Sequence, residues 1–99
     1  MVDKFVNGVK TRSGDERLTI IGERIKSIRK SKGLTQGQVA ELMGTATTVI
    51  SRLERGTLNP TIMNFMGLCS ALEVDPSELL HGLRRMRTKG DSNDGDNFI

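Results

Sequence analysis

The 99-residue sequence contains no tryptophan, no tyrosine and only three phenylalanines. Proteins that bind single-stranded nucleic acid commonly stack bases on aromatic side chains, so the composition argues against that mode of binding. The single cysteine, Cys69, excludes an internal disulfide bond. No apolar run is long enough for a signal peptide or a membrane span, and we therefore expect a cytoplasmic protein.

The sequence also lacks the residue patterns of catalytic and metal sites. No spacing of residues suits a metal ion, and no glycine-rich loop suits a bound phosphate. Cys69 and His81 have no evident second ligand and no nucleophile placed to use them, so we expect a packed thiol and a histidine near a helix end. We predict no enzyme activity, no cofactor and no metal.

Basic residues are clustered, although the formal net charge is only +3. The clusters comprise Arg24, Lys26, Arg29, Lys30 and Lys32, then Arg52 and Arg55, then Arg84, Arg85, Arg87 and Lys89. A solvated helix face is the usual explanation of any single run of this kind. Together the clusters suit a polyanionic partner.

Apolar spacing predicts one small all-α domain between two tails. Residues 1–12 are expected to form an N-terminal arm, residues 13–88 the domain, and residues 89–99 a disordered acidic tail. The first helix is predicted to begin at the capping box of Ser13 and Glu16 and to end near Lys32. A start at a Thr19 cap is the alternative.

Capping residues and apolar spacing predict four further helices. They are placed at 35–43, at 47–55, after a Thr61 cap and after the start signal Asp75-Pro76-Ser77-Glu78. The fourth is expected to turn inward Ile62, Phe65, Leu68, Cys69 and Leu72. The fifth is expected to place on its apolar side Leu79, Leu80, Leu83 and Met86.

The second and third predicted helices are too short to be stable alone, so packing must hold them in place. Gly44 between them allows a sharp turn, and the small Ala40 allows a close approach. In this geometry a second helix can protrude and enter the major groove of DNA.

The motifs around this helix pair are shared by one family. They are Arg29-x-x-x-Gly33-Leu34-Thr35-Gln36, Ala40, Gly44, Ile50-Ser51-x-x-Glu54-x-Gly56 and Pro60. Their spacing resembles the Cro/C1-type, or XRE-type, helix-turn-helix family of phage repressors and bacterial regulators, over half to two-thirds of the chain. The resemblance implies a compact five-helix, lambda-repressor-like domain that docks on double-stranded DNA as a homodimer, with the third helix as recognition helix.

The resemblance also implies roles for individual residues. Base contacts are expected from Thr47, Thr48 and Arg52, and contacts to the DNA backbone from Gln36, Ser51, Arg55, Thr57 and Asn59. Arg29 and Glu54 occupy positions that similar proteins often join by an ion pair between the first and third helices. The chemistry of these side chains supports the base-contact roles independently of the resemblance. An arginine can donate two hydrogen bonds to guanine, and a threonine can contact several bases.

The turn before the third helix departs from the family pattern. Ala46 stands where a capping serine is usual, and Ala46 cannot cap. Thr45 or Thr47 is therefore expected to cap the third helix.

Apolar residues on the last two helices exceed what one core stripe requires. We interpret Met63, Met66, Leu83 and Met86 as candidates for a dimer interface; extra core packing is the alternative. A symmetric dimer would place two recognition helices about 34 Å apart on a palindromic operator.

The sequence therefore predicts a transcriptional regulator, most simply a dimeric repressor. An antitoxin or a restriction-modification controller protein would use the same domain. A protein-interaction adaptor with this fold is the rival from a different class, and it predicts sequence-blind DNA binding in which Arg52 is dispensable.

Overall fold

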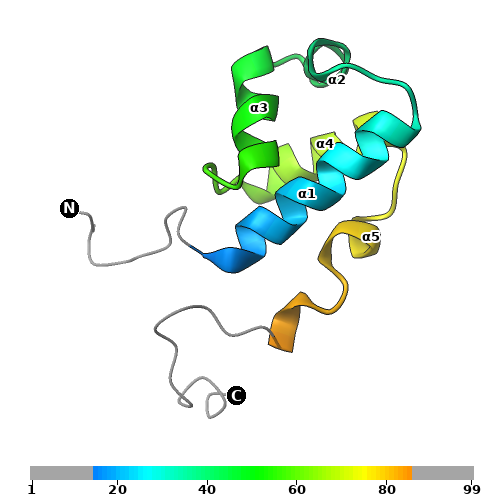
Figure 1. Cartoon of the computed structure of the whole chain (residues 1–99). Coiled ribbons are helices and arrows are strands. Elements are labelled where there is room, and N and C mark those ends of the chain that lie inside the picture. Colours follow the sequence, from blue (N-terminus) through cyan, green and yellow to red (C-terminus); the bar gives the residue numbers. More distant parts are fainter. Residues whose placement is uncertain (1–14, 86–99) are drawn as a thin grey trace, which may run out of the picture.

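The computed structural model describes residues 15–85, which fold into helices without any strand (Figure 1). The helices are α1 (Glu16–Ser31), α2 (Gln36–Met43), α3 (Thr47–Arg55), α4 (Ile62–Leu72) and α5 (Pro76–Leu80), followed by the 3-10 turn η1 (Leu83–Arg85). The all-α prediction with five α-helices is therefore confirmed for this part of the chain. The predicted arm, the acidic tail and Met86 lie outside the described residues.

Three helix starts follow the predicted capping signals. Thr35 and Gln38 form a capping box at the start of α2, and Asp75 and Glu78 form another at the start of α5. The hydroxyl of Thr61 accepts a hydrogen bond from the backbone N–H of Asn64 in α4. Each capping group provides an acceptor for an N–H that has no partner inside its helix.

The start of α1 corrects the prediction. Asp15, not Ser13, is the N-cap, and its carboxylate accepts hydrogen bonds from the backbone N–H and the guanidinium of Arg17. Ser13 lies outside the described residues, and Thr19 lies within α1, so the alternative start is also wrong. A carboxylate directly before the first helical residue is the better cap, because it also meets the positive end of the helix dipole.

The start of α3 gives a second correction. Ala46 is the N-cap and makes no side-chain cap hydrogen bond, so neither Thr45 nor Thr47 takes that role. The hydroxyl of Thr47 is therefore not committed to capping.

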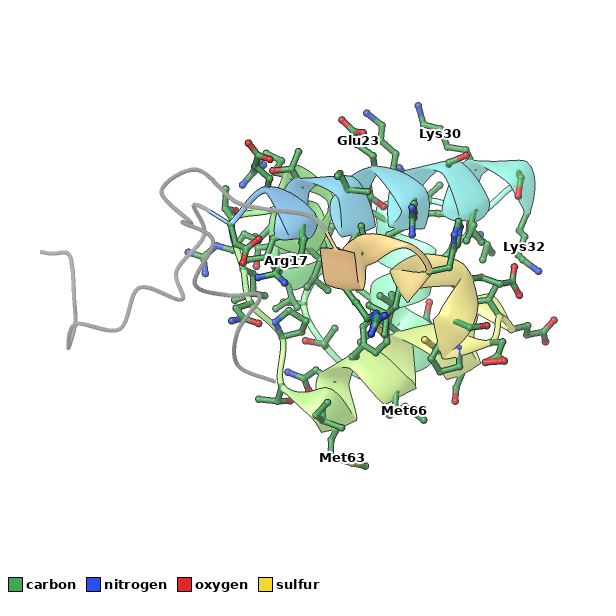
Figure 2. All side chains as sticks on the ribbon, turned by 90° about the horizontal axis from the view of Figure 1, so that it is seen from below. Arg17, Glu23, Lys30, Lys32, Met63 and Met66 are labelled. Atoms are coloured by element: carbon green, nitrogen blue, oxygen red, sulfur yellow. The ribbon has the colours of Figure 1, made fainter. Side chains whose placement is uncertain are left out.

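The core lies between α1, the α2–α3 pair and α4. Its buried apolar residues are Ile25, Val39, Ala40, Ile50, Leu53, Phe65, Leu68, Cys69, Leu72 and Leu79. Ile62 was predicted to face inward but is 74% exposed, and the buried side of α4 begins only at Phe65. Figure 2 shows Met63 and Met66 projecting from α4 on the side away from α1.

The fifth helix is shorter than its apolar pattern predicts. It ends at Leu80, and Gly82 adopts a positive φ of 81° before η1 begins. The guanidinium of Arg24 donates hydrogen bonds to the carbonyls of Leu79 and His81, which ties the turn after α5 to α1.

The turn after Leu80 also changes the role of Leu83. Leu83 is only 6% exposed within one chain. The prediction that it offers surface to a partner is therefore wrong.

None of the helices between residues 15 and 85 combines the length and apolar character needed to cross a membrane.

Candidate nucleic-acid interface

Thr47, Thr48 and Arg52, the residues expected to contact bases, are all exposed on α3, and their contact with DNA stays a prediction. The opposite face buries Ile50 and Leu53 against the core. Apolar residues thus anchor the helix from behind, so that its polar face is presented to solvent without any rearrangement.

The last turn of α3 adds a second arginine to this surface. The guanidinium of Arg55 donates a hydrogen bond of 2.7 Å to the hydroxyl of Ser51, one turn earlier on the same helix. The hydroxyl of Thr57 donates to the carbonyl of Arg52, which helps to close the helix end. Ser51, Arg55 and Thr57 therefore lie together at the carboxyl end of α3.

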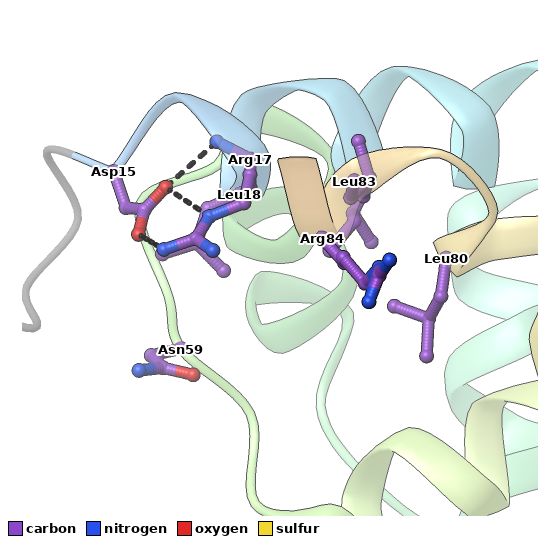
Figure 3. Close-up of a pocket in the computed structure, with 8 residues that line it drawn as sticks. Asp15, Arg17, Leu18, Asn59, Leu80, Leu83 and Arg84 are labelled. Atoms are coloured by element: carbon purple, nitrogen blue, oxygen red, sulfur yellow. Dashed lines mark hydrogen bonds and ion pairs between the residues drawn. The ribbon is translucent and has the colours of Figure 1, made fainter. Parts of the chain in front are cut away.

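Asn59 is placed differently from these three residues. It lines a groove of about 450 Å³ between the start of α1 and the α5–η1 segment (Figure 3). Asp15, Leu80 and Arg84 line the same groove. The structure does not bring Asn59 onto the outer face of α3, and its contact with DNA stays a prediction.

The start of α2 presents two unoccupied backbone donors. Thr35 caps the N–H of Gln38, whereas no acceptor among residues 15–85 bonds the backbone N–H of Gln36 or Gly37. Gly37 is exposed and has no side chain to cover these donors. The positive end of a helix with open N–H groups is a suitable site for a phosphate.

A buried ion pair lies behind both helices. Arg29 of α1 binds Glu54 of α3 through two hydrogen bonds, of 2.6 Å from Nε and 3.1 Å from Nη2. The Nη1 of Arg29 donates to the carbonyl of Leu34 at 2.8 Å, just before α2. The predicted ion pair is confirmed.

The electrostatics of this pair agree with its geometry. Burial raises the pKa of Glu54, but hydrogen bonds from Arg29 and Gln36 outweigh it, so that the pKa lies below its ordinary value of 4.5. The hydrogen bond to Glu54 raises the pKa of Arg29. Both groups therefore remain charged at neutral pH.

The second partner of Glu54 was not predicted. The side-chain Nε2 of Gln36 donates to Oε1 of Glu54 at 3.0 Å, so the amide expected to meet DNA also touches the ion pair. No local pattern links two residues 18 positions apart, because only the packing of α2 against α3 brings them together.

Cys69 and His81 lie in different environments, one buried and one exposed. Cys69 is buried in the core, which confirms the packed thiol, and burial raises its pKa. His81 is exposed at the end of α5. Within residues 15–85, no group of three or more histidine, cysteine, aspartate or glutamate side chains is arranged to hold a metal ion.

Comparisons with known proteins agree with this geometry. Residues 25–79 match the helix-turn-helix family. The uncharacterized HTH-type transcriptional regulator y4dJ of Sinorhizobium fredii is 38% identical over 61 residues, which cover 62% of this chain and 79% of that protein.

Two solved structures share the fold. The restriction-modification controller protein C.AhdI from Aeromonas hydrophila has a TM-score of 0.63 and 34% identity, covering 65% of this chain and 97% of that chain. The P22 c2 repressor in complex with a synthetic operator has a TM-score of 0.60 and 33% identity, covering 64% of this chain and 96% of that chain.

The match to the phage repressor covers only part of that protein. The complete repressor protein C2 of Salmonella phage P22 is 33% identical over 63 residues, which is 29% of its length. The family match over residues 25–79 runs from within α1 to α5 and contains the α2–α3 pair and both residues of the Arg29–Glu54 ion pair. The chain belongs to the helix-turn-helix family of the Cro/C1, or XRE, type.

Proposed function

We propose that this protein is a sequence-specific regulator of transcription that binds double-stranded DNA with α3 in the major groove. The observation that carries the proposal is the exposed face of Thr47, Thr48 and Arg52 on a helix anchored from behind by Ile50 and Leu53. The major groove admits one α-helix, and base edges there carry a distinct pattern of donors and acceptors. The similarity to a repressor solved with its operator supports the same reading.

The proposed roles follow from donor chemistry. Arg52 donates two hydrogen bonds to O6 and N7 of a guanine, and Thr47 and Thr48 contact neighbouring bases. Ser51, Arg55 and Thr57 contact phosphates near the end of α3, Asn59 contacts one from the loop before α4, and Gln36 contacts one at the start of α2. Phosphate contacts fix the position of the helix, whereas base contacts select the sequence.

The same proposal includes a homodimer. Met63 and Met66, which are 75% and 44% exposed, form an apolar surface on α4 (Figure 2). Two copies joined through this surface would present two recognition helices to a palindromic operator, with half-sites about 34 Å apart. Repression by blocking access to a promoter in the cytoplasm is the simplest outcome, since it needs no further domain.

A restriction-modification controller is the second candidate function. It is favoured by the match to C.AhdI, which extends over 97% of that solved chain. Both candidates use the same DNA contacts and differ in the genes they regulate. Genes for a methyltransferase and an endonuclease beside the operator would identify the controller.

The test is selection from a random DNA library at about 150 mM salt, because protein–DNA affinities depend steeply on salt. Wild type is compared with Arg52→Ala and with Arg84→Ala. Arg84 is an exposed arginine beside Leu80 and Leu83 (Figure 3), and it serves as a control for the loss of one positive charge.

We expect wild type and Arg84→Ala to enrich the same two-fold symmetric site. Arg52→Ala should lose preference at one base pair in each half-site, equivalent to about 1–3 kcal/mol. If no protein enriches any sequence above bulk DNA, the proposal is wrong, and the adaptor reading, with its sequence-blind DNA binding, replaces it.

A further inference from the structure

Three helices meet at one buried carboxylate. Glu54 of α3 accepts hydrogen bonds from Arg29 of α1 and from the side-chain amide of Gln36, the first residue of α2. A purely structural ion pair needs only the contact between Arg29 and Glu54. The bond to Gln36 extends this pair to the end of α2 that is proposed to face DNA.

The chemistry of the contact fixes how the Gln36 amide is turned. An ionised carboxylate can only accept hydrogen bonds, so the amide nitrogen, and not the amide oxygen, must face Glu54. The nitrogen carries two hydrogens, and the bond to Oε1 at 3.0 Å uses one of them. The other hydrogen is left for a second acceptor.

The charge of Glu54 does not oppose an anion at this position. Arg29 neutralises the carboxylate through two hydrogen bonds, and the side chains of the pair are 9% and 3% exposed. A phosphate approaching α2 would therefore meet the open backbone donors of Gln36 and Gly37 and the amide of Gln36, above a neutral pair.

We propose that Glu54 is a positioning residue for DNA binding, which holds the Gln36 amide so that its second N–H donates to a backbone phosphate at the start of α2. This inference rests on the proposed DNA-binding function and deepens it. A glutamine that is free in solution must be immobilised when it binds, whereas Gln36 is already held. Loss of the Glu54 contact should therefore weaken binding about three- to tenfold.

The experiment compares four proteins on the selected operator at about 150 mM salt. They are wild type, Gln36→Met, Glu54→Gln and the double variant. Each is measured on unmodified duplex and on duplexes in which single phosphates are replaced by neutral methylphosphonates. Glu41→Gln, which removes an exposed negative charge from α2, is the control for net charge.

We expect one phosphate to account for the effect of both substitutions. Gln36→Met and Glu54→Gln should each bind unmodified DNA about three- to tenfold more weakly than wild type. On the duplex in which that phosphate is neutral, both variants should bind with the same affinity as wild type. The double variant should lose no more than either single variant. Equal weakening by Glu54→Gln on unmodified and modified duplexes would show a merely structural role and overturn the proposal.

A second measurement uses only the wild type, so its result does not depend on whether the Glu54→Gln variant folds. In the free protein, one side-chain amide proton of Gln36 should exchange slowly with water, and operator binding should protect the second. If operator binding instead speeds exchange of the first proton, Gln36 leaves Glu54 to reach DNA, and the proposal is wrong. Failure of the wild type to prefer its operator over unrelated DNA would overturn the proposed function itself.

Discussion

The Nε of Arg29 lies 2.6 Å from Oε2 of Glu54, and this contact joins α1 to α3 through two nearly buried side chains. A third donor of the same guanidinium binds the carbonyl of Leu34 before α2. Three of the five α-helices between residues 15 and 85 are thus positioned around one ion pair. The pair fixes how the recognition helix and the start of α2 lie relative to each other.

Removal of one residue of the Arg29–Glu54 ion pair should destabilise the fold. Glu54→Ala leaves the guanidinium of Arg29 buried without its counterion, and we expect the free energy of unfolding to fall by about 3–5 kcal/mol. Urea denaturation followed by circular dichroism measures this loss. Glu41→Ala, at an exposed position on α2, should change stability by less than about 0.5 kcal/mol. Equal stability of the two variants would contradict a buried pair.

Stability should decrease at acid pH. The pKa of Glu54 is lower in the folded chain than its ordinary value of 4.5, and the pKa of Asp15 is lowered by its bonds with Arg17. A depressed pKa contributes stability that is fully present above the ordinary value and is lost as the pH falls through the folded pKa. Urea midpoints should therefore be constant between pH 6 and 7 and decrease below about pH 4.5. Glu54→Gln should show a shallower decrease, whereas an unchanged slope would contradict the assignment to Glu54.

Two glycines inside helices should respond oppositely to alanine. A Cβ at Gly22 of α1 would lie 2.4 Å from the carbonyl oxygen of Glu54 and 2.5 Å from that of Leu53. Gly22→Ala must push α1 away from α3, and we expect the free energy of unfolding to fall by about 2 kcal/mol. A Cβ at Gly67 of α4 would meet nothing closer than Met43 at 4.0 Å.

Gly67→Ala is therefore the matched control for Gly22→Ala. Its free energy of unfolding should rise by about 0.5–1 kcal/mol, because alanine has a higher helix propensity than glycine. Thermal unfolding of both variants compares the two effects directly. A stabilising Gly22→Ala would show that the α1–α3 contact is looser than the structure indicates.

Local signals predicted the helix starts correctly where one side chain caps its own helix. The hydroxyls of Thr35 and Thr61 and the carboxylate of Asp75 act within three residues, so the sequence contains the whole interaction. The end of α5 also had a local signal, since Gly82 follows the last apolar turn and adopts a positive φ. The apolar spacing that continues through Leu83 led to the longer helix.

Contacts between distant segments could not be predicted in this way. The requirement for glycine at position 22 arises from the backbone of α3, which lies more than 30 residues later in the chain. The bond between Gln36 and Glu54 and the exposure of Ile62 likewise depend on how whole helices pack. The family resemblance assigned the residues at the interface, but packing determines which of their polar atoms are already occupied.

The apolar surface of α4 should control dimer formation. Met63 and Met66 project from the side of α4 away from α1 (Figure 2), and burial of one methionine side chain contributes about 1.5–3 kcal/mol. The double variant Met63→Gln/Met66→Gln should therefore weaken self-association at least about tenfold, measured by sedimentation equilibrium. Leu42→Gln removes an exposed apolar side chain from α2 and should leave association unchanged.

The effect on DNA separates dimer loss from misfolding. A folded monomer retains its recognition helix, so the double variant should bind a single half-site with wild-type affinity. It should lose the extra affinity that two half-sites at the proper spacing provide, because a second linked contact acts at high effective concentration. If sedimentation finds the wild type and the double variant equally dimeric, the interface lies on another surface, and the exposed methionines of α4 have no role in assembly.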